Sequence, residues 1–246
     1  MKILITSAQS VLGRAIASEL AAGHELRLLE TEPIKGPPGT ECAVADLMRA
    51  ATLPAAVSGV EVVIHTGELP LTAPQDDGAR LEWYTRGTYD LMAAAIEAGA
   101  RRFVYCGTLD LFDSYPNDVY ITELHEPFPP PAGQSLWRYL AELTIREFVR
   151  DNAITGTALR LGTLVAEDEA EPEAPDYSWL DPGDAARAVR TALARDSSDA
   201  LNWVRRWQIH HVCANPPNPR FLIHPEIQQG FEHSFAAAWA RGEGLK

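Results

Sequence analysis

The chain of 246 residues has few basic side chains and no long hydrophobic run. It contains 21 lysines and arginines against 34 aspartates and glutamates, and its formal net charge is −13. Binding of DNA or RNA depends on clustered basic residues that neutralise phosphates, so we expect no nucleic-acid partner. No apolar stretch approaches the roughly 18 residues that cross a bilayer. We therefore expect no membrane segment.

Cysteine is also scarce, with three widely separated residues at Cys42, Cys106 and Cys213. This spacing matches no metal-binding pattern, and an odd number of thiols fits a reducing compartment better than a disulfide framework. The apolar stretch within Met1–Thr6 is too short for the core of a signal peptide. We expect a cytoplasmic protein without a metal site.

Short β-branched runs alternate with helical stretches along most of the chain. The expected elements are, in order, Lys2–Thr6, Ser10–Ala22, Glu25–Glu30, Val60–Thr66, Leu81–Ala98, Arg102–Gly107, Leu136–Asp151 and Thr157–Leu161. The short runs carry apolar residues almost without alternation, which is typical of strands buried on both faces. The pattern predicts an α/β fold of the Rossmann type, a doubly wound parallel sheet that binds ligands at the carboxyl ends of its strands.

We expect a single domain over residues 1–246, in which residues from about 163 to 246 contribute a small C-terminal lobe on the substrate side. This lobe includes an aromatic-rich strand region, Trp203–Val212, in which alternation predicts that one of His210 and His211 is buried. Pro127–Pro131 and the run Ala166–Tyr177, with six acidic residues and no basic one, are expected loops. The acidic run is either a mobile lid that disfavours anionic ligands or a solvated loop without function.

The segment Ile3–Arg14 predicts a buried strand that enters a phosphate-binding turn and a helix. In a TGxxGxxG dinucleotide-binding turn, Thr6 is followed by three glycines, but here Ser7 and Ser10 replace the first two and Gly13 alone remains. These glycines supply positive φ and let backbone N–H groups reach the pyrophosphate. A non-glycine residue in the left-handed conformation costs about 1–2 kcal/mol. The serines are thus compatible with the turn, but their side chains crowd the phosphate, and we expect dinucleotide affinity to be weak or lost.

Four segments resemble one known family. Gly87–Tyr105 is similar to the GTxNLLEAAxxAGVxRFVY segment of the extended short-chain dehydrogenase/reductase superfamily, in its NAD-dependent epimerase/dehydratase group. Val62–His65, Ala158–Gly162 and Trp179–Ala188 resemble further segments of this family in the expected order. The matches cover roughly residues 1–190, and the short chain is closest in size to the compact uronate dehydrogenase-like members.

The resemblance implies an NAD-dependent oxidoreductase or epimerase that acts on a sugar-like or small hydroxylated molecule. It also allows a homodimer that pairs through the helices beginning near Leu81 and Leu136. The implied cofactor contacts lie in the turn and at the following strand ends, at Thr6, Ser7, Ser10, Val11, Gly13, Glu30, Asp46, Leu47, His65, Thr66 and Gly67.

Two of these residues indicate the nucleotide. A carboxylate at Glu30, at the end of the second strand, accepts hydrogen bonds from ribose hydroxyls and repels a 2′-phosphate, which favours NAD over NADP. Asp46 takes the place where the family meets the adenine amino group. For His65, a structural hydrogen bond to the backbone is an equal alternative to a cofactor contact.

The catalytic residues are where the chain departs from the family, which uses a Ser or Thr together with a YxxxK pair. Thr108 matches the Ser or Thr, but Gln134 stands at the tyrosine position and Arg138 at the lysine position. Arg138 retains the positive charge and can hold a ribose hydroxyl, whereas a glutamine amide is no general acid. Asp110 and Tyr84 are weaker candidates for a replacement acid, each with a structural alternative.

Three functional classes therefore stay open. The first is the inherited oxidoreductase or epimerase. The second is a non-catalytic Rossmann protein that senses a nucleotide or binds a small molecule, and the third is a cofactor-independent, non-redox catalyst that uses the same pocket. The altered turn and the replaced YxxxK pair favour the second and third classes, whereas Glu30, Asp46 and Thr108 favour the first and second.

Overall fold

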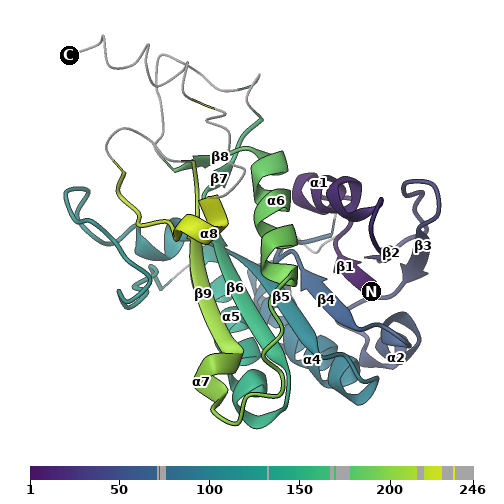
Figure 1. The fold of residues 1–246 in the computed structure, drawn as a ribbon. Helices are drawn as coiled ribbons and strands as arrows, with labels where there is room; N and C mark the ends of the chain where they lie inside the picture. Colours follow the sequence, from purple (N-terminus) through teal and green to yellow (C-terminus); the bar gives the residue numbers. More distant parts are fainter. Residues whose placement is uncertain are drawn as a thin grey trace.

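The computed structural model describes residues 1–70, 72, 76–131, 133–166, 169, 178–214, 219–228 and 235. Seven parallel strands form one sheet in the order β3-β2-β1-β4-β5-β6-β9 (Figure 1). Their bounds are β1 Lys2–Thr6, β2 Glu25–Glu30, β3 Glu41–Val44, β4 Val62–His65, β5 Arg102–Thr108, β6 Thr155–Leu161 and β9 Trp207–Val212. In this order the first three strands extend from β1 to one edge of the sheet, and the chain then crosses to the other side of β1, where β4 and the later strands are added. This switch point between β1 and β4 confirms the predicted Rossmann-type fold.

Helices cover both faces of the sheet. One hydrophobic core lies under α1 (Val11–Leu20) and α6 (Pro182–Leu193), and the other lies under α2 (Leu53–Val57), α4 (Thr88–Glu97) and α5 (Gln134–Asp151). Successive side chains of a strand point to opposite faces. In β1, Ile3 and Ile5 accordingly enter the first core and Leu4 the second.

The helix expected over Leu81–Ala98 begins earlier and is not uniform. It starts as α3, Asp77–Glu82, where the Asp76 side chain accepts a hydrogen bond from the Ala79 N–H at 2.9 Å. A π-helical turn over Trp83–Gly87 then leads into α4. This turn carries the buried aromatic side chains of Trp83 and Tyr84.

The C-terminal part contributes to the main sheet and to a small second one. β9 pairs with β6, while β7 (Thr163–Leu164) and β8 (Trp179–Leu180) form a separate two-stranded sheet. α7 (Trp203–Arg206) precedes β9, and α8 (Pro225–Gln228) follows it. His211 is fully buried and His210 is not, as the alternation predicted. Most of the acidic run, residues 167, 168 and 170–177, lies outside the described residues.

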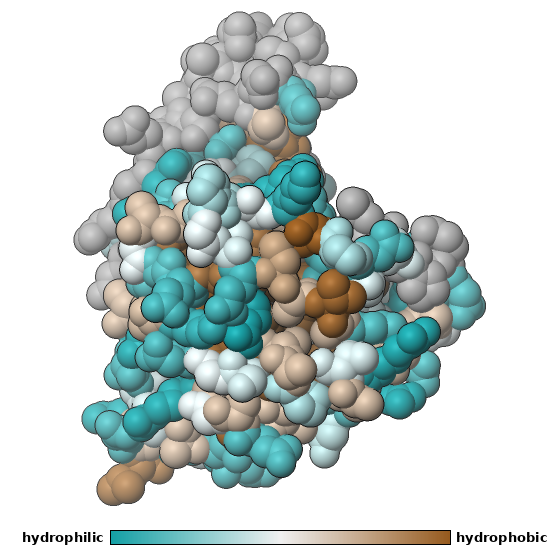
Figure 2. Space-filling view, turned by 90° about the vertical axis from the view of Figure 1, so that its right-hand side faces the viewer, coloured by the Kyte–Doolittle hydropathy of each residue, from teal (hydrophilic) through white to brown (hydrophobic). Residues whose placement is uncertain are grey.

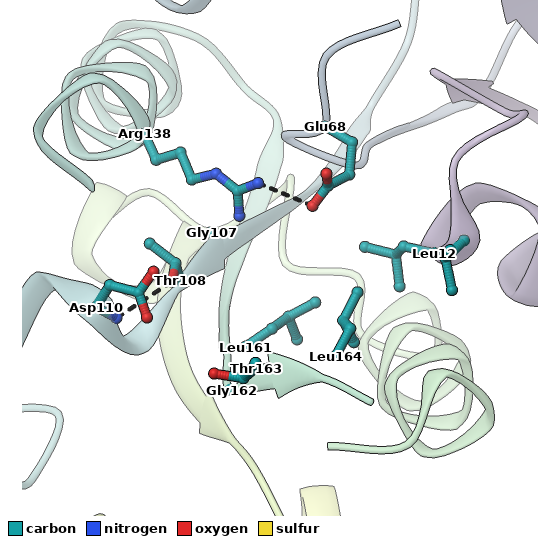
Figure 3. A pocket seen from close by; sticks show the side chains of 11 residues that line it. Leu12, Glu68, Gly107, Thr108, Asp110, Arg138, Leu161, Gly162, Thr163 and Leu164 are labelled. Carbon is teal, nitrogen blue, oxygen red and sulfur yellow. Dashed lines mark hydrogen bonds and ion pairs between the residues drawn. The ribbon is translucent and has the colours of Figure 1, made fainter. Parts of the chain in front are cut away.

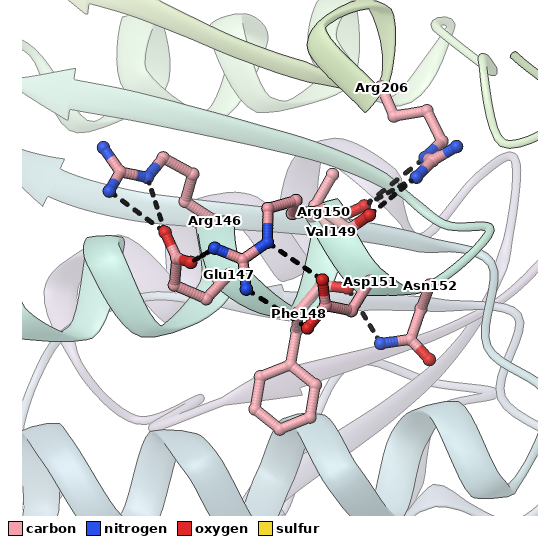
Figure 4. A network of polar contacts seen from close by, with 8 residues as sticks. All are labelled: Arg146, Glu147, Phe148, Val149, Arg150, Asp151, Asn152 and Arg206. Carbon is pink, nitrogen blue, oxygen red and sulfur yellow. Dashed lines mark hydrogen bonds and ion pairs between the residues drawn. The ribbon is translucent and has the colours of Figure 1, made fainter. Parts of the chain in front are cut away.

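Arg206 anchors the C-terminal end of α5 (Figure 4). Its guanidinium donates to the carbonyl oxygens of Val149 and Arg150, at 3.2 and 3.0 Å from Nη2, and to that of Ala200 at 2.7 Å from Nη1. The last carbonyls of a helix have no partner within the helix, so this buried cation satisfies two of them.

Figure 2 shows the face of the molecule on the side of α1 and β3. Hydrophilic and intermediate side chains cover most of this face, and hydrophobic ones gather in a small central group. Within the described part of the chain, no helix is long and apolar enough to cross a membrane.

A buried ion pair joins α5 to β6. The Arg160 guanidinium donates to Glu142 through Nη2 at 2.7 Å and Nε at 3.1 Å, and the two side chains are 2% and 3% exposed. Breaking such a pair leaves a charge without compensation in the interior.

We therefore predict that Glu142→Gln lowers the free energy of unfolding by about 3–5 kcal/mol. The double variant Glu142→Leu with Arg160→Met should recover most of this loss, because it removes both charges. Glu147→Gln, on the exposed face of the same helix, should cost under about 1 kcal/mol. Urea denaturation measures all three, and equal losses in Glu142→Gln and Glu147→Gln would contradict the prediction.

Candidate functional site

The β1–α1 turn holds Ser7 in a glycine-like conformation. Ser7 has φ of +44° and is the one non-glycine residue with positive φ in the described part of the chain. This conformation costs about 1–2 kcal/mol. The Ser7 hydroxyl donates to the Glu68 carbonyl oxygen at 2.6 Å, which fixes the turn against the loop after β4.

The second serine is not strained. Ser10 has φ of −61° and is the N-cap of α1, where its Oγ accepts a hydrogen bond from the Gly13 N–H at 2.9 Å. Gly13 itself is sterically required, because a Cβ there would lie 2.5 Å from the Ser7 carbonyl oxygen. Of the three glycine positions of the motif, position 7 requires a positive φ, and position 13 has no room for a Cβ.

The N-terminus of α1 opens onto a pocket of about 310 Å³ (Figure 3). The N–H groups of its first residues, Val11 and Leu12, have no carbonyl partner within the helix, and both residues line the pocket. Such an N-terminus favours an anionic group through its N–H donors and the helix dipole.

Glu30 supports the same turn from β2. It is 5% exposed, and its Oε1 accepts a hydrogen bond from the Gln9 N–H at 2.8 Å. Together with Ser7, Leu47 and Trp83 it lines a second, very small cavity of about 10 Å³. Asp46 makes a local contact instead, since its Oδ1 accepts from the Met48 N–H at 2.9 Å.

His65 lies beneath the site rather than in a pocket. Its fully buried imidazole lies between two hydroxyls, with Nδ1 2.9 Å from Thr6 Oγ1 and Nε2 3.2 Å from Thr88 Oγ1. Burial, with a contribution from the Arg138 charge, lowers the pKa of His65 to about 3. Thr66 donates to the Thr6 carbonyl oxygen at 3.1 Å, so these residues join the ends of β1 and β4.

Gly67 continues this junction into the pocket wall. It has φ of +64°, and a Cβ there would lie 2.3 Å from the Cys106 carbonyl oxygen. Its own carbonyl accepts the Tyr84 hydroxyl at 3.1 Å. The loop after β4 therefore follows a path that only glycine permits, and this path places Glu68 at the pocket.

The charged side chains of the pocket are Glu68, Asp110 and Arg138. In Figure 3, Arg138 and Glu68 point toward one another from α5 and from the loop after β4, and Leu161 and Leu164 lie on the opposite side. Arg138 Nη2 is 2.8 Å from Glu68 Oε1. Further lining comes from Val11, Leu12, Gly107, Thr108, Gly162 and Thr163.

Arg138 stays cationic in this environment. Burial alone would lower the pKa of its guanidinium, but Glu68 and the hydroxyls of Tyr84 and Tyr105 outweigh burial and raise it. The Tyr105 hydroxyl donates to the Arg138 carbonyl oxygen at 2.9 Å. Burial raises the pKa of both tyrosines, so each hydroxyl stays neutral. Each donates its hydrogen bond to a backbone carbonyl, Tyr84 to that of Gly67 and Tyr105 to that of Arg138.

The structure separates the proposed catalytic residues. Thr108 and Arg138 line the pocket, and Thr108 Oγ1 accepts a hydrogen bond from the Asp110 N–H at 3.1 Å. Gln134 is the exposed first residue of α5 and does not line the pocket. Across the described residues, no tyrosine, histidine or lysine lines this pocket, and no group of metal-binding side chains is found.

Sequence reasoning missed Glu68. Its partner Arg138 is 70 positions away, and no local pattern indicates their contact. The available signal was its place directly after Gly67 at the end of a buried strand, where a Rossmann-type sheet binds its ligands.

Comparison with known proteins agrees with this fold. Residues 8–200 match the model of the family described as NAD(P)H-binding, and the chain belongs to this family. The strand order of its sheet also agrees with the fold expected from the resemblance to the extended short-chain dehydrogenase/reductase superfamily.

Among curated relatives, the 3-diazoavenalumate denitrifying reductase of Streptomyces sp. is 30% identical over 67% of this chain, and the match spans 56% of that relative's length. The L-arabinose 1-dehydrogenase (NAD(P)(+)) of Haloferax volcanii is 21% identical over 81% of this chain and 85% of its own. Glucuronic acid dehydrogenase from Chromohalobacter salexigens has a similar solved structure, with a TM-score of 0.80 at 19% identity over 100% of this chain and 89% of that one.

The buried His65 generates a pH prediction. Its pKa of about 3 in the folded protein lies below its ordinary value of 6.5, so between these values the unfolded chain binds a proton that the folded protein does not. The free energy of unfolding should therefore fall as the pH drops below 6.5, by about 1.4 kcal/mol per pH unit from this residue. Burial and Arg160 similarly lower the pKa of His211 to about 3, which steepens the slope.

Urea denaturation between pH 7 and pH 4 tests the effect. His65→Gln should reduce the slope by about 1.4 kcal/mol per pH unit. His224→Gln replaces an exposed imidazole and serves as the matched control. An unchanged slope in His65→Gln would show that the imidazole binds protons equally in the folded and the unfolded chain, so that folding does not lower its pKa.

Proposed function

We propose that this protein is an NAD-dependent oxidoreductase that acts on a small hydroxylated, sugar-like molecule and holds its dinucleotide weakly. The observation that carries the proposal is that the N-terminus of α1, Thr108 and Arg138 all open onto one pocket. The names of two Haloferax volcanii relatives, an L-arabinose 1-dehydrogenase and an NAD-dependent glucose-6-phosphate dehydrogenase, support a sugar-like substrate.

The residues present fit a dinucleotide in outline. The N–H groups of Val11 and Leu12, which have no partner within α1, suit a pyrophosphate, and Glu30 suits an adenosine ribose without a 2′-phosphate. Arg138 suits a ribose hydroxyl on the other side of the pocket. A nicotinamide held there supplies or accepts a hydride.

Three features support weak binding. The Ser10 hydroxyl already occupies the Gly13 N–H, which reduces the donors left for a phosphate. The Ser7 hydroxyl is committed to the Glu68 carbonyl oxygen, and Glu30 Oε1 is committed to the Gln9 N–H. The cavity beside Glu30 has a volume of about 10 Å³, so an adenosine must displace side chains to enter.

The chain's own residues bind and orient more readily than they transfer protons. The Thr108 hydroxyl can donate to a substrate oxygen, and the Arg138 cation stabilises negative charge that develops on it. Gln134 is exposed at the start of α5 and supplies no acid. The carbonyl or alcohol chemistry of the family should therefore be slow.

A second candidate is a non-catalytic dinucleotide or small-molecule binding protein. It is favoured by the hydroxyls of Tyr84 and Tyr105, which donate to backbone carbonyls and so offer no replacement for the missing phenol. Turnover separates the two candidates, because the oxidoreductase should transfer hydride slowly and the binding protein should transfer none.

We predict that NAD and NADH raise the melting temperature more than NADP and NADPH do, since Glu30 repels a 2′-phosphate. A ligand at a concentration of 100 times its Kd raises the free energy of unfolding by about 2.7 kcal/mol, and this sets the size of the expected shift in melting temperature. Ser7→Gly with Ser10→Gly should tighten binding, because both side chains leave the phosphate site.

Ser7→Ala is the matched control for this series. It removes the hydroxyl but keeps a Cβ at positive φ, so it should tighten binding less than Ser7→Gly. Tighter binding of NADPH than of NADH would contradict the role of Glu30. No change in the double glycine variant would show that the turn does not serve a phosphate.

We also predict slow hydride transfer by the natural chain with sugar-like alcohols or aldehydes, because general acid–base catalysis contributes about 10²–10⁴-fold and Gln134 supplies none. Gln134→Tyr with Arg138→Lys, added to the two glycine changes, should raise the rate of NADH formation, measured by absorbance. Gln134→Phe in the same background controls for the phenol hydroxyl. Robust turnover that survives Gln134→Ala would sink this prediction and direct attention to Asp110.

A further inference from the structure

The charges that line the pocket do not balance. Two carboxylates, Glu68 and Asp110, face one guanidinium, Arg138. Among the described residues, Asp110 has no ion-pair partner, and its side chain is exposed at the pocket. Away from the N-terminus of α1, a ligand that enters therefore meets side chains with a net negative charge.

The Arg138 cation is already engaged. Its Nη2 lies 2.8 Å from Glu68 Oε1, with the two side chains 15% and 30% exposed. A partly buried pair of this kind is screened less by salt than an exposed one. A carboxylate ligand would have to displace Glu68 from Arg138 while also approaching Asp110.

The position of Glu68 does not depend on its side chain. The loop after β4 is fixed by Gly67, which has no room for a Cβ, and by the hydrogen bond from Ser7 to the Glu68 carbonyl. The backbone thus presents whichever side chain stands at this position to Arg138, and the carboxylate determines what charge the pocket presents.

We infer that Glu68 is a specificity-determining residue, which occupies Arg138 and makes the pocket accept uncharged or cationic hydroxylated molecules and reject carboxylates. This inference rests on the proposed function, because it takes the pocket as the substrate site. The polar groups that remain for hydroxyls are the Thr108 and Thr163 side chains and the Asp110 carboxylate. Asp110 adds attraction for a cation.

Three sugars of the same ring size test the inference: glucose, glucosamine at a pH where its amine is protonated, and glucuronate. Calorimetric titration of the dinucleotide-free protein should show glucosamine and glucose binding at least about tenfold more tightly than glucuronate. Glu68→Gln frees the Arg138 charge and should improve glucuronate relative to glucose by about tenfold. Asp110→Asn should weaken glucosamine relative to glucose.

Glu82→Gln removes an exposed carboxylate outside the pocket and should leave all ratios unchanged. The unfolding midpoint of each variant shows whether it is folded, and Asp110→Asn, at an exposed position, tests the charge argument even if Glu68→Gln is unstable. If the relative affinities for the three sugars are the same in the natural chain and in these variants, the inference is overturned. It is also overturned if no sugar binds. A failure of NAD to bind in the same calorimeter would instead overturn the proposed function and leave the sugar ratios as measured.

Discussion

The hydrogen bond from the Ser7 hydroxyl to the Glu68 carbonyl oxygen joins the two halves of the site. Ser7 holds the strained turn before α1, and Glu68 follows β4 and reaches Arg138 on α5. A glycine at position 7 would relax the backbone but would lose this bond. Compared with a glycine, the serine at position 7 leaves less space for a phosphate, but its hydroxyl links the turn to the pocket wall. A strained residue held by its surroundings in this way is typical of a functional site.

Local pattern was sufficient to predict most of the sheet. The limits of Lys2–Thr6 and Glu25–Glu30 follow from runs of apolar residues, and the structure has the same bounds. The helix expected from Leu81 begins at Asp77, and its π-helical turn places Trp83 and Tyr84 in the core. Tertiary packing, including the close approach of Gly87 to Leu47, accompanies that turn and leaves no local sequence signal. The pairing of β9 with β6 joins residues about 50 positions apart, and no local sequence pattern predicts it.

The site was predictable where the resemblance supplies a position and unpredictable where it depends on contacts between distant residues. Arg138 could be assigned because it stands at the lysine position of the family's YxxxK pair, and it does line the pocket. The surroundings of His65 could not be assigned, since its two hydroxyl partners come from β1 and α4. Glu30 lies at the predicted strand end, yet its Oε1 bonds to the turn itself. A carboxylate in that position can support the turn and still face a ribose through its other oxygen.

The scarcity of proton donors in and around the pocket limits its chemistry more than the altered turn does. A general acid must exchange its proton near the working pH. Burial raises the pKa of Tyr84 and Tyr105 and lowers that of His65, so these groups stay neutral through the physiological range. Arg138 stays charged for the opposite reason, because Glu68 compensates its burial. Of the two carboxylates that line the pocket, Glu68 is engaged by Arg138, and Asp110 has no ion-pair partner among the described residues. The described lining can thus bind and orient a hydroxylated ligand but gives little help with its proton, which agrees with the slow hydride transfer that we propose.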